Sequence, residues 1–115
     1  MKITVLGTRG EIEPSKQYHS RHSGVLIDTR LLFDLGEREF LDYNPRHIFI
    51  THLHPDHAYF IRQGEKIDRK MYTPDNFHRK GSFGKYTVKP IPTHHSKKVK
   101  SQAYLIKRGK NTVLY

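Results

Sequence analysis

The stretch from Ile48 to His57 constrains the fold of this chain more than any other, and it reads IFITHLHPDH. It opens with a short apolar run, which is typical of a buried strand. Three histidines and an aspartate follow within six positions, namely His52, His54, Asp56 and His57. Pro55 has no amide proton to give to a strand ladder, so we expect the chain to turn there. The pattern predicts a buried strand that runs directly into a loop of metal-ligating side chains.

These polar side chains form two sets that suit a metal site. His52 and His54 follow the strand end, while Asp56 and His57 are expected to begin a helix. A negative side chain is favoured there because of the helix dipole. Imidazole nitrogens and carboxylate oxygens are typical ligands of zinc. The stretch therefore predicts a site for one or two metal ions.

This order of residues is the His-x-His-x-Asp-His signature, and here the sequence resembles the metallo-β-lactamase-fold hydrolases. The resemblance extends through nearly the whole chain. It includes ITVLGTRG at residues 3–10, LFDLG at 32–36, and a third-histidine segment formed by PTHHS at 92–96 with QAYLI at 102–106. It implies an α/β fold, the metallo-β-lactamase-like αββα sandwich, with a mixed sheet and a few short helices.

The resemblance also implies a ligand set for the first metal ion. His52, His54 and one histidine of the PTHHS segment would bind zinc and leave one position open for water. The family tends to place this third ligand directly before a serine, which favours His95 over His94, although His94 stays an alternative. Manganese and iron are alternatives to zinc.

Other residues acquire roles through the same resemblance. Asp56 and His57 would begin a second metal site, and Asp56 would also orient the attacking hydroxide as a catalytic residue. Asp34 closes an expected strand just upstream of the motif, where the family uses an aspartate to support the metal ligands by hydrogen bonding. An ordinary turn aspartate is the alternative interpretation, and the sequence favours neither.

The implied reaction is hydrolysis by a zinc-activated water that attacks a phosphorus or carbonyl centre. Residues 1–60 contain seven Lys and Arg against eight Asp and Glu, whereas residues 61–115 contain fourteen against three. A basic second half attracts polyanions, so RNA or another phosphodiester is favoured over a β-lactam as substrate. The alternatives are a solvated basic surface, and a metal- or nucleic-acid-binding module without turnover.

The family normally continues past a strand like TVLY at residues 112–115 with a bridging aspartate and a final histidine. We therefore expect residues 1–115 to form one domain, truncated at its C-terminus, that matches the N-terminal half of the usual sandwich. A missing segment, a second half-domain or another copy of the chain would complete the site. Leu105 and Val113 are expected on an open sheet face that favours self-association.

Composition narrows the class of protein further. The 115 residues contain no cysteine, which excludes disulfides and thiolate ligands. No apolar run approaches the ~20 residues of a membrane span, and no secretory signal follows Met1, so a cytoplasmic location is expected. Residues 11–23 are polar and aperiodic, and their His19, Arg21 and His22 are expected at the surface near a cleft mouth.

Apolar runs and turn signals predict the remaining elements. Strands are expected at residues 2–6, 24–28, 30–34, 48–51, 70–72, 86–91, 102–107 and 112–115, and helices at 37–43, 57–63 and 74–80. Tight turns are expected at residues 28–30 and 83–84, and a hairpin about residues 108–111. We expect the strands to form one sheet that needs cover on both faces.

Overall fold

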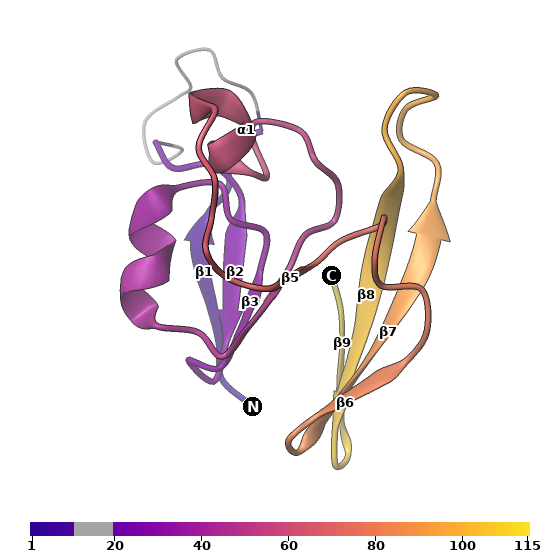
Figure 1. Ribbon diagram of the computed structural model, residues 1–115. Coiled ribbons are helices and arrows are strands. Elements are labelled where there is room, and N and C mark those ends of the chain that lie inside the picture. Colours follow the sequence, from indigo (N-terminus) through magenta and orange to yellow (C-terminus); the bar gives the residue numbers. More distant parts are fainter. Residues whose placement is uncertain (11–19) are drawn as a thin grey trace.

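Two β-sheets pack face to face in the computed structural model, which describes residues 1–10 and 20–115 (Figure 1). The first sheet contains β1 (Ile3–Gly7), β2 (Gly24–Ile27), β3 (Leu31–Phe33), β4 (His47–Phe49) and β5 (Met71–Tyr72). The second contains β6 (Gly81–Phe83), β7 (Tyr86–Thr93), β8 (Ser101–Arg108) and β9 (Asn111–Leu114). The described residues also form a 3₁₀ helix, η1 (Arg38–Tyr43), and an α-helix, α1 (Tyr59–Gln63). The predicted position of His19 lies outside the described residues.

The first sheet is mixed, with the strand order β1-β2-β3-β4-β5. The β1–β2 and β2–β3 pairs are antiparallel, and the β3–β4 and β4–β5 pairs are parallel. Asp28 and Thr29 turn the chain between β2 and β3 with φ angles of 49° and 56°. The Asp28 carboxylate secures this turn, because it accepts a hydrogen bond from Lys2 N at 2.6 Å. The tight turn predicted at residues 28–30 is confirmed.

The second sheet is antiparallel throughout, and hairpins join its consecutive strands. Gly84 and Gly109 occupy two of these hairpin turns with φ angles of 62° and 57°, a region that glycine adopts without steric penalty. The turn predicted at residues 83–84 and the hairpin predicted about residues 108–111 are confirmed. The sequence pattern did not predict β6.

Aromatic side chains fill the seam between the two sheets. Phe33 stacks on Phe49 with 4.9 Å between ring centroids, and Tyr104 packs edge-on against Phe49 at 5.5 Å. The buried side chains of this seam are Ile27, Leu31, Phe33, Phe49, Phe77, Phe83, Tyr86, Val88, Tyr104 and Ile106. The other face of the first sheet packs against η1 and α1 through a second apolar cluster. β3 and most of β4 are thus buried on both faces, so Leu31–Phe33 and the Ile48-Phe49 pair are apolar throughout.

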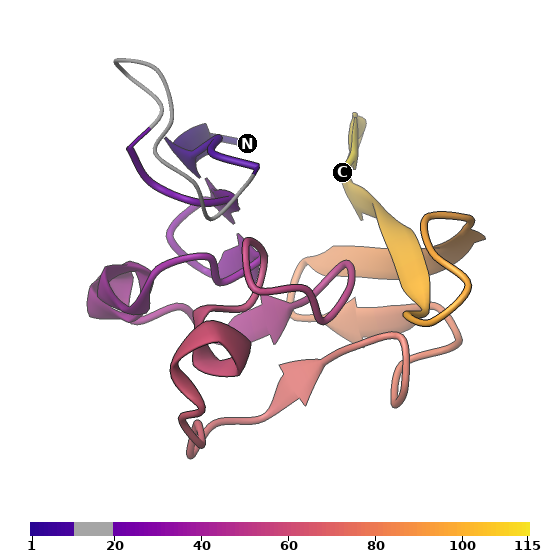
Figure 2. The ribbon, with the colours of Figure 1, turned by 90° about the horizontal axis from the view of Figure 1, so that it is seen from above.

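The sheets and helices form three layers (Figure 2). Both helices lie against the first sheet, and within the described part of the chain no helix covers the outer face of the second sheet. The prediction of a single sheet is wrong, because this chain builds two sheets that cover each other. Val113 packs into the seam and not on an open face as expected. Leu105 does lie on the outer face, opposite Leu114, which is 67% exposed.

The helix that follows the histidine-rich stretch begins later than predicted. Asp56 and His57 lie in a turn, and α1 starts only at Tyr59. Main-chain pairing with Leu35 holds Ala58 extended, since Leu35 N donates to His57 O and Tyr59 N donates to Leu35 O, both at 2.8 Å. The helix-dipole argument for Asp56 is therefore wrong.

The other two predicted helices also differ. The helix predicted at residues 37–43 is the 3₁₀ helix η1, Arg38–Tyr43, instead of an α-helix. Residues 74–80 form a single turn, because the Asn76 carboxamide bonds the main chain at Thr73 N and Met71 O and competes with helix formation. Within residues 1–10 and 20–115, no helix has the length and apolar character needed to cross a membrane. The cytoplasmic location stays a prediction.

Tyr104 joins the two sheets, and its removal provides a test of this packing. Its hydroxyl lies 2.5 Å from Ile50 O, to which it donates, and accepts a hydrogen bond from Gln102 Nε2 at 3.0 Å. Tyr104→Phe is expected to lower the free energy of unfolding by about 1–3 kcal/mol, because it leaves a buried carbonyl unpaired. Urea denaturation measures the change. The control is Tyr43→Phe, at a site that is 46% exposed, and equal effects of the two variants would contradict this role.

Candidate metal centre

The histidine-rich loop is anchored where the end of β4 meets the second sheet. Gln102 N, near the start of β8, donates to Thr51 O at 2.9 Å. The next residue of the loop, His52, forms an isolated antiparallel bridge with Ser101. These contacts place the loop that follows β4 beside the connection between β7 and β8.

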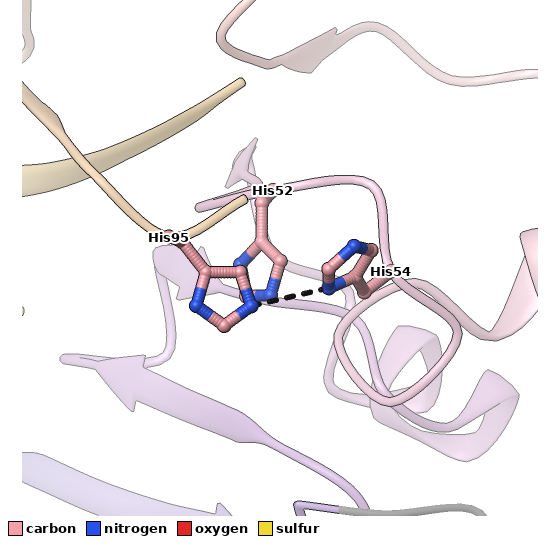
Figure 3. Close-up of side chains that lie close together, drawn as sticks. All are labelled: His52, His54 and His95. Carbon is pink, nitrogen blue, oxygen red and sulfur yellow. Dashed lines mark hydrogen bonds between the residues drawn. The ribbon is translucent and has the colours of Figure 1, made fainter. Parts of the chain in front are cut away.

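Three histidines from these two segments converge on one point (Figure 3). His52 and His54 come from the loop after β4, and His95 comes from the β7–β8 connection. Each offers a ring nitrogen, and these nitrogens lie within 4.8 Å of one another. His95 Nε2 and His54 Nδ1 are 3.3 Å apart. His94 is exposed and belongs to no group of three or more metal-ligating side chains among the described residues.

His52 also belongs to a second group, with Asp56 and His57, whose ligand atoms likewise lie within 4.8 Å of one another. His57 Nε2 is 3.1 Å from Asp56 Oδ2, and the ring centroids of His52 and His57 are 4.1 Å apart. The sequence had indicated Asp56 and His57 as a set of their own. The structure adds His52 to that set, so one buried imidazole is shared by both groups.

Asp34 lies behind the histidines and is fully buried. Its Oδ2 is 2.6 Å from His57 Nδ1, and its Oδ1 accepts a hydrogen bond from Thr51 N at 2.7 Å. Asp34 has a φ angle of 63°, in the left-handed region that aspartate enters more readily than most residues. Its main chain is held there because Asp34 N donates to Phe49 O at 2.7 Å. The alternative of an ordinary turn aspartate does not describe this buried, multiply bonded carboxylate.

These hydrogen bonds orient the His57 ring and select the tautomer of His52. A carboxylate only accepts hydrogen bonds, so His57 donates from Nδ1 to Asp34, while its Nε2 faces the Asp56 carboxylate at 3.1 Å. Thr51 Oγ1 also donates to Asp34 Oδ2, at 2.9 Å. The same hydroxyl lies 2.9 Å from His52 Nδ1 and can only accept from it, which leaves Nε2 of the neutral His52 ring unprotonated. Asp34 therefore fixes the orientation of His57 and, through Thr51, leaves His52 with a nitrogen lone pair for a cation.

Two residues of this network, Thr51 and Tyr115, were not predicted from the sequence. Tyr115 Oη donates to Asp34 Oδ2 at 3.0 Å. Burial and the Asp34 charge raise the pKa of Tyr115, so its hydroxyl keeps the proton that it donates. Thr51 lies directly before His52 in the sequence, and this position could have indicated that its hydroxyl supports the histidine. No local pattern could indicate Tyr115, because it lies 81 residues from Asp34 in sequence.

Arg62 holds the turn between the two ligand groups. Its guanidinium donates to Pro55 O at 2.7 Å and to Gly36 O at 3.1 Å, and it pairs with Glu37 at 2.8 Å. Glu37 also lies 3.2 Å from His22 Nδ1. The prediction that His22 lies at the surface is wrong, because this contact and close packing leave it only 4% exposed.

The cluster separates the proton affinities of neighbouring imidazoles. Burial, with the nearby rings of His57, His54 and His95 acting in the same direction, lowers the pKa of His52 to about 3. Burial alone would also lower the pKa of His57. The hydrogen bond and charge of Asp34, together with the charge of Asp56, outweigh burial and raise the pKa of His57.

The donor set fits a borderline divalent cation such as zinc, which prefers imidazole nitrogen and carboxylate oxygen when no thiolate is present. His52 is kept neutral by burial and presents a free lone pair. His95 is exposed and His54 is half-buried, so one side of the cluster faces solvent. Water and a substrate can reach the cluster from that side.

The scan against family models found no match to this sequence, and the search of curated proteins also found none. A search of solved structures did find similar folds. The crystal structure of the metallo-beta-lactamase fold protein YhfI from Bacillus subtilis superposes with a TM-score of 0.69 over 98% of this chain, at 20% sequence identity. The chain has a metallo-β-lactamase fold. It spans 60% of the length of the YhfI chain.

The metallo-β-lactamase fold agrees with the mixed sheet, the antiparallel sheet and the few short helices described above. At this level of identity the likeness concerns the fold alone. The roles of the histidines and aspartates therefore rest on their own geometry and chemistry.

The lowered pKa of His52 predicts that the metal-free protein loses stability in mild acid. Below about pH 6.5 the unfolded chain binds a proton at this histidine, whereas the folded chain does not until the pH approaches about 3. The free energy of unfolding should therefore fall by up to about 1.4 kcal/mol per pH unit from this one group.

Urea denaturation in EDTA at pH 5 and pH 6.5 measures this effect. His52→Gln should reduce the difference between the two pH values, because it removes the group whose folded and unfolded pKa values differ. The exposed His94→Gln serves as control and should leave that difference unchanged. An unchanged pH dependence in His52→Gln would rule out this explanation.

Proposed function

We propose that this chain is a metal-dependent hydrolase whose first metal ion is held by His52, His54 and His95. The observation that supports it best is the convergence of three imidazoles to within 4.8 Å from segments about 40 residues apart. Several imidazoles packed together repel one another when they are protonated. A metal ion binds their neutral forms through the nitrogen lone pairs, and so it stabilises the cluster. We propose zinc as the ion, with manganese or iron as alternatives that accept the same donors.

Asp56 and His57 would hold the second ion of the proposed site, and His52 belongs to both ligand groups. Bound metal supplies Lewis acidity and lowers the pKa of water at the centre. Asp56 is the proposed catalytic residue, because its carboxylate belongs to the second ligand group and can orient a water and accept its proton. The carboxylate is held in place by its contact with His57 at 3.1 Å.

Asp34 is a positioning residue in this proposal. It does not touch the solvent side of the cluster, and it acts through His57 directly and through Thr51 on His52. Supporting carboxylates of this kind fix the tautomer and orientation of histidine ligands. Tyr115 in turn holds one oxygen of the Asp34 carboxylate.

The proposed substrate is a phosphodiester, with RNA as the leading candidate. Three lysines, Lys97, Lys98 and Lys100, follow His95 in the same connection. Lys97 lines a surface hollow together with His95. Cations beside the metal site would bind the phosphate oxygens of the substrate and neutralise charge in the transition state. A β-lactam offers the lysines only a single carboxylate, so it would gain less binding energy from them than a phosphodiester chain.

The proposal includes a partner that completes the domain. The full αββα arrangement has helices on both outer faces, and we propose that a further segment or a second copy covers the outer face of β7, β8 and β9. The half-buried Leu105 and the exposed Leu114 on that face support the idea. Such a partner would also supply further ligands to the open side of the cluster. Sedimentation of the purified chain measures whether it self-associates.

Zinc affinity tests the ligand set directly. His95→Ala should weaken zinc binding by more than about 100-fold, because loss of a ligand exceeds the 10–100-fold effect of losing a supporting group. His94→Ala is the matched control from the adjacent position and should leave affinity within about twofold, since His94 belongs to neither group. Competition with a chromogenic chelator measures both. Equal losses in the two variants would exclude His95 as the specific third ligand.

Turnover distinguishes a hydrolase from the alternative, a metal- or nucleic-acid-binding module. The zinc- or manganese-loaded chain should release p-nitrophenol from bis(p-nitrophenyl) phosphate, and Asp56→Asn should slow this by about 100-fold or more, the usual effect of losing a general base. Asp75→Asn, at an exposed site in another loop, controls for the charge change. Metal binding without any turnover would favour the binding module.

A further inference from the structure

A cleft of about 250 Å³ opens between the two sheets, at the end of the molecule opposite to the histidine cluster. Its floor is formed by the buried side chains of Leu31, Phe83 and Tyr86. β4 and β7 both start at this cleft and both end next to the histidines. Because β7 has eight residues at about 3.3 Å each, the two sites are roughly 25 Å apart. Figure 1 shows the β6–β7 turn and the β8–β9 hairpin together at this lower end.

The rim of the cleft carries four cations, Arg30, Arg46, Lys85 and Arg108. Arg108 is neutralised by Asp28, with a nitrogen–oxygen distance of 2.8 Å. Within the described part of the chain, the side chains of the other three make no hydrogen bond or ion pair, and no carboxylate lines the cleft. The rim therefore holds three positive charges that have no internal counterion.

Main-chain hydrogen bonds and ring contacts fix the backbone that carries these cations. Arg46 N and His47 N both donate to Arg30 O, at 2.8 and 3.2 Å, which ties the β2–β3 turn to the start of β4. The His47 ring packs edge-on against Phe83 at 4.9 Å, and Phe83 pairs in register with Tyr86. The three unpaired rim cations thus come from three chain segments that are held together by main-chain and aromatic contacts.

We propose that this cleft binds the phosphate groups of a nucleotide or of a nucleic-acid strand. Two guanidinium groups and one ammonium group facing one hollow match the geometry and charge of phosphate oxygens, because arginine can bond two oxygens at once. The apolar floor beneath the cations excludes water from one side of the bound group and strengthens these bonds. The site is independent of the proposed hydrolysis, since it shares no residue with the histidine cluster.

The experiment is a titration of the ¹⁵N-labelled, metal-free protein with pyrophosphate, followed by amide chemical shifts. The amides of Arg30, Arg46 and Lys85 should shift with a common dissociation constant. Arg30→Gln and Arg46→Gln should each raise that constant by about tenfold, the usual effect of losing one charge-assisted hydrogen bond. All of these positions are exposed, so the variants should fold normally.

The control is Lys89→Gln, which removes the same charge from an exposed position on the outer face of β7. It should change the dissociation constant by less than about twofold. The proposal is overturned if the control weakens binding as much as Arg46→Gln, if the shifts are confined to the histidine cluster, or if no amide of the cleft shifts.

Two further titrations identify the source of the phosphate. If AMP binds as tightly as a six-residue single-stranded oligothymidylate, the ligand is a free nucleotide. If the oligothymidylate binds more tightly, and its dissociation constant rises more steeply with salt, the ligand is a nucleic-acid strand, because several of its phosphates then release counterions. Either result supports a phosphate site at this cleft.

Discussion

The buried carboxylate of Asp34 is the constraint on which the candidate centre depends. It lies at the end of β3, fully excluded from solvent, and collects hydrogen bonds from Thr51, His57 and Tyr115. A buried carboxylate that lost these donors would be strongly destabilising, so the loop after β4 and the end of β9 must stay in place around it. Through Thr51, the same carboxylate also determines which nitrogen of His52 is free to bind a cation.

The aromatic seam between the sheets keeps this arrangement rigid. Phe33 and Phe49 belong to the first sheet and Tyr104 to the second, and their rings lie within 4.9 to 5.6 Å of one another. The hydroxyl of Tyr104 reaches across the seam to the main chain at Ile50, directly before the ligand loop. Packing and hydrogen bonding therefore fix the same point of the chain from two directions, which limits how far His52 can move relative to the second sheet.

The two ends of the seam have different chemistry. At the end of β4 and β7, imidazoles and carboxylates form a site for a cation. At the start of the same strands, arginines and a lysine surround a hollow suited to an anion. A fold shared with YhfI accounts for the scaffold, whereas the chemistry of either end comes from side chains that the fold does not dictate. A strand of nucleic acid is long enough to contact both ends, and the charge of the second half of the chain would attract it.

The sequence by itself determined the local features of this protein. The His-x-His-x-Asp-His spacing indicated a ligand loop after a buried strand, and the resemblance that it carried predicted the fold found in the structure. Turns about Asp28, Gly84 and Gly109 were predictable, because each depends on the conformational freedom of one or two residues. The position directly before a serine had also favoured His95 over His94, and the structure brings His95 to the cluster.

Only the tertiary structure decided how distant segments meet. It divided the strands between two sheets, placed His52 in both ligand groups and brought Tyr115 to Asp34. It also delayed the start of α1, because Ala58 pairs with Leu35 in an extended conformation that helical composition cannot reveal. These outcomes depend on pairing and burial between segments far apart in sequence. A local sequence pattern does not specify which distant partner a strand, a carboxylate or an imidazole contacts.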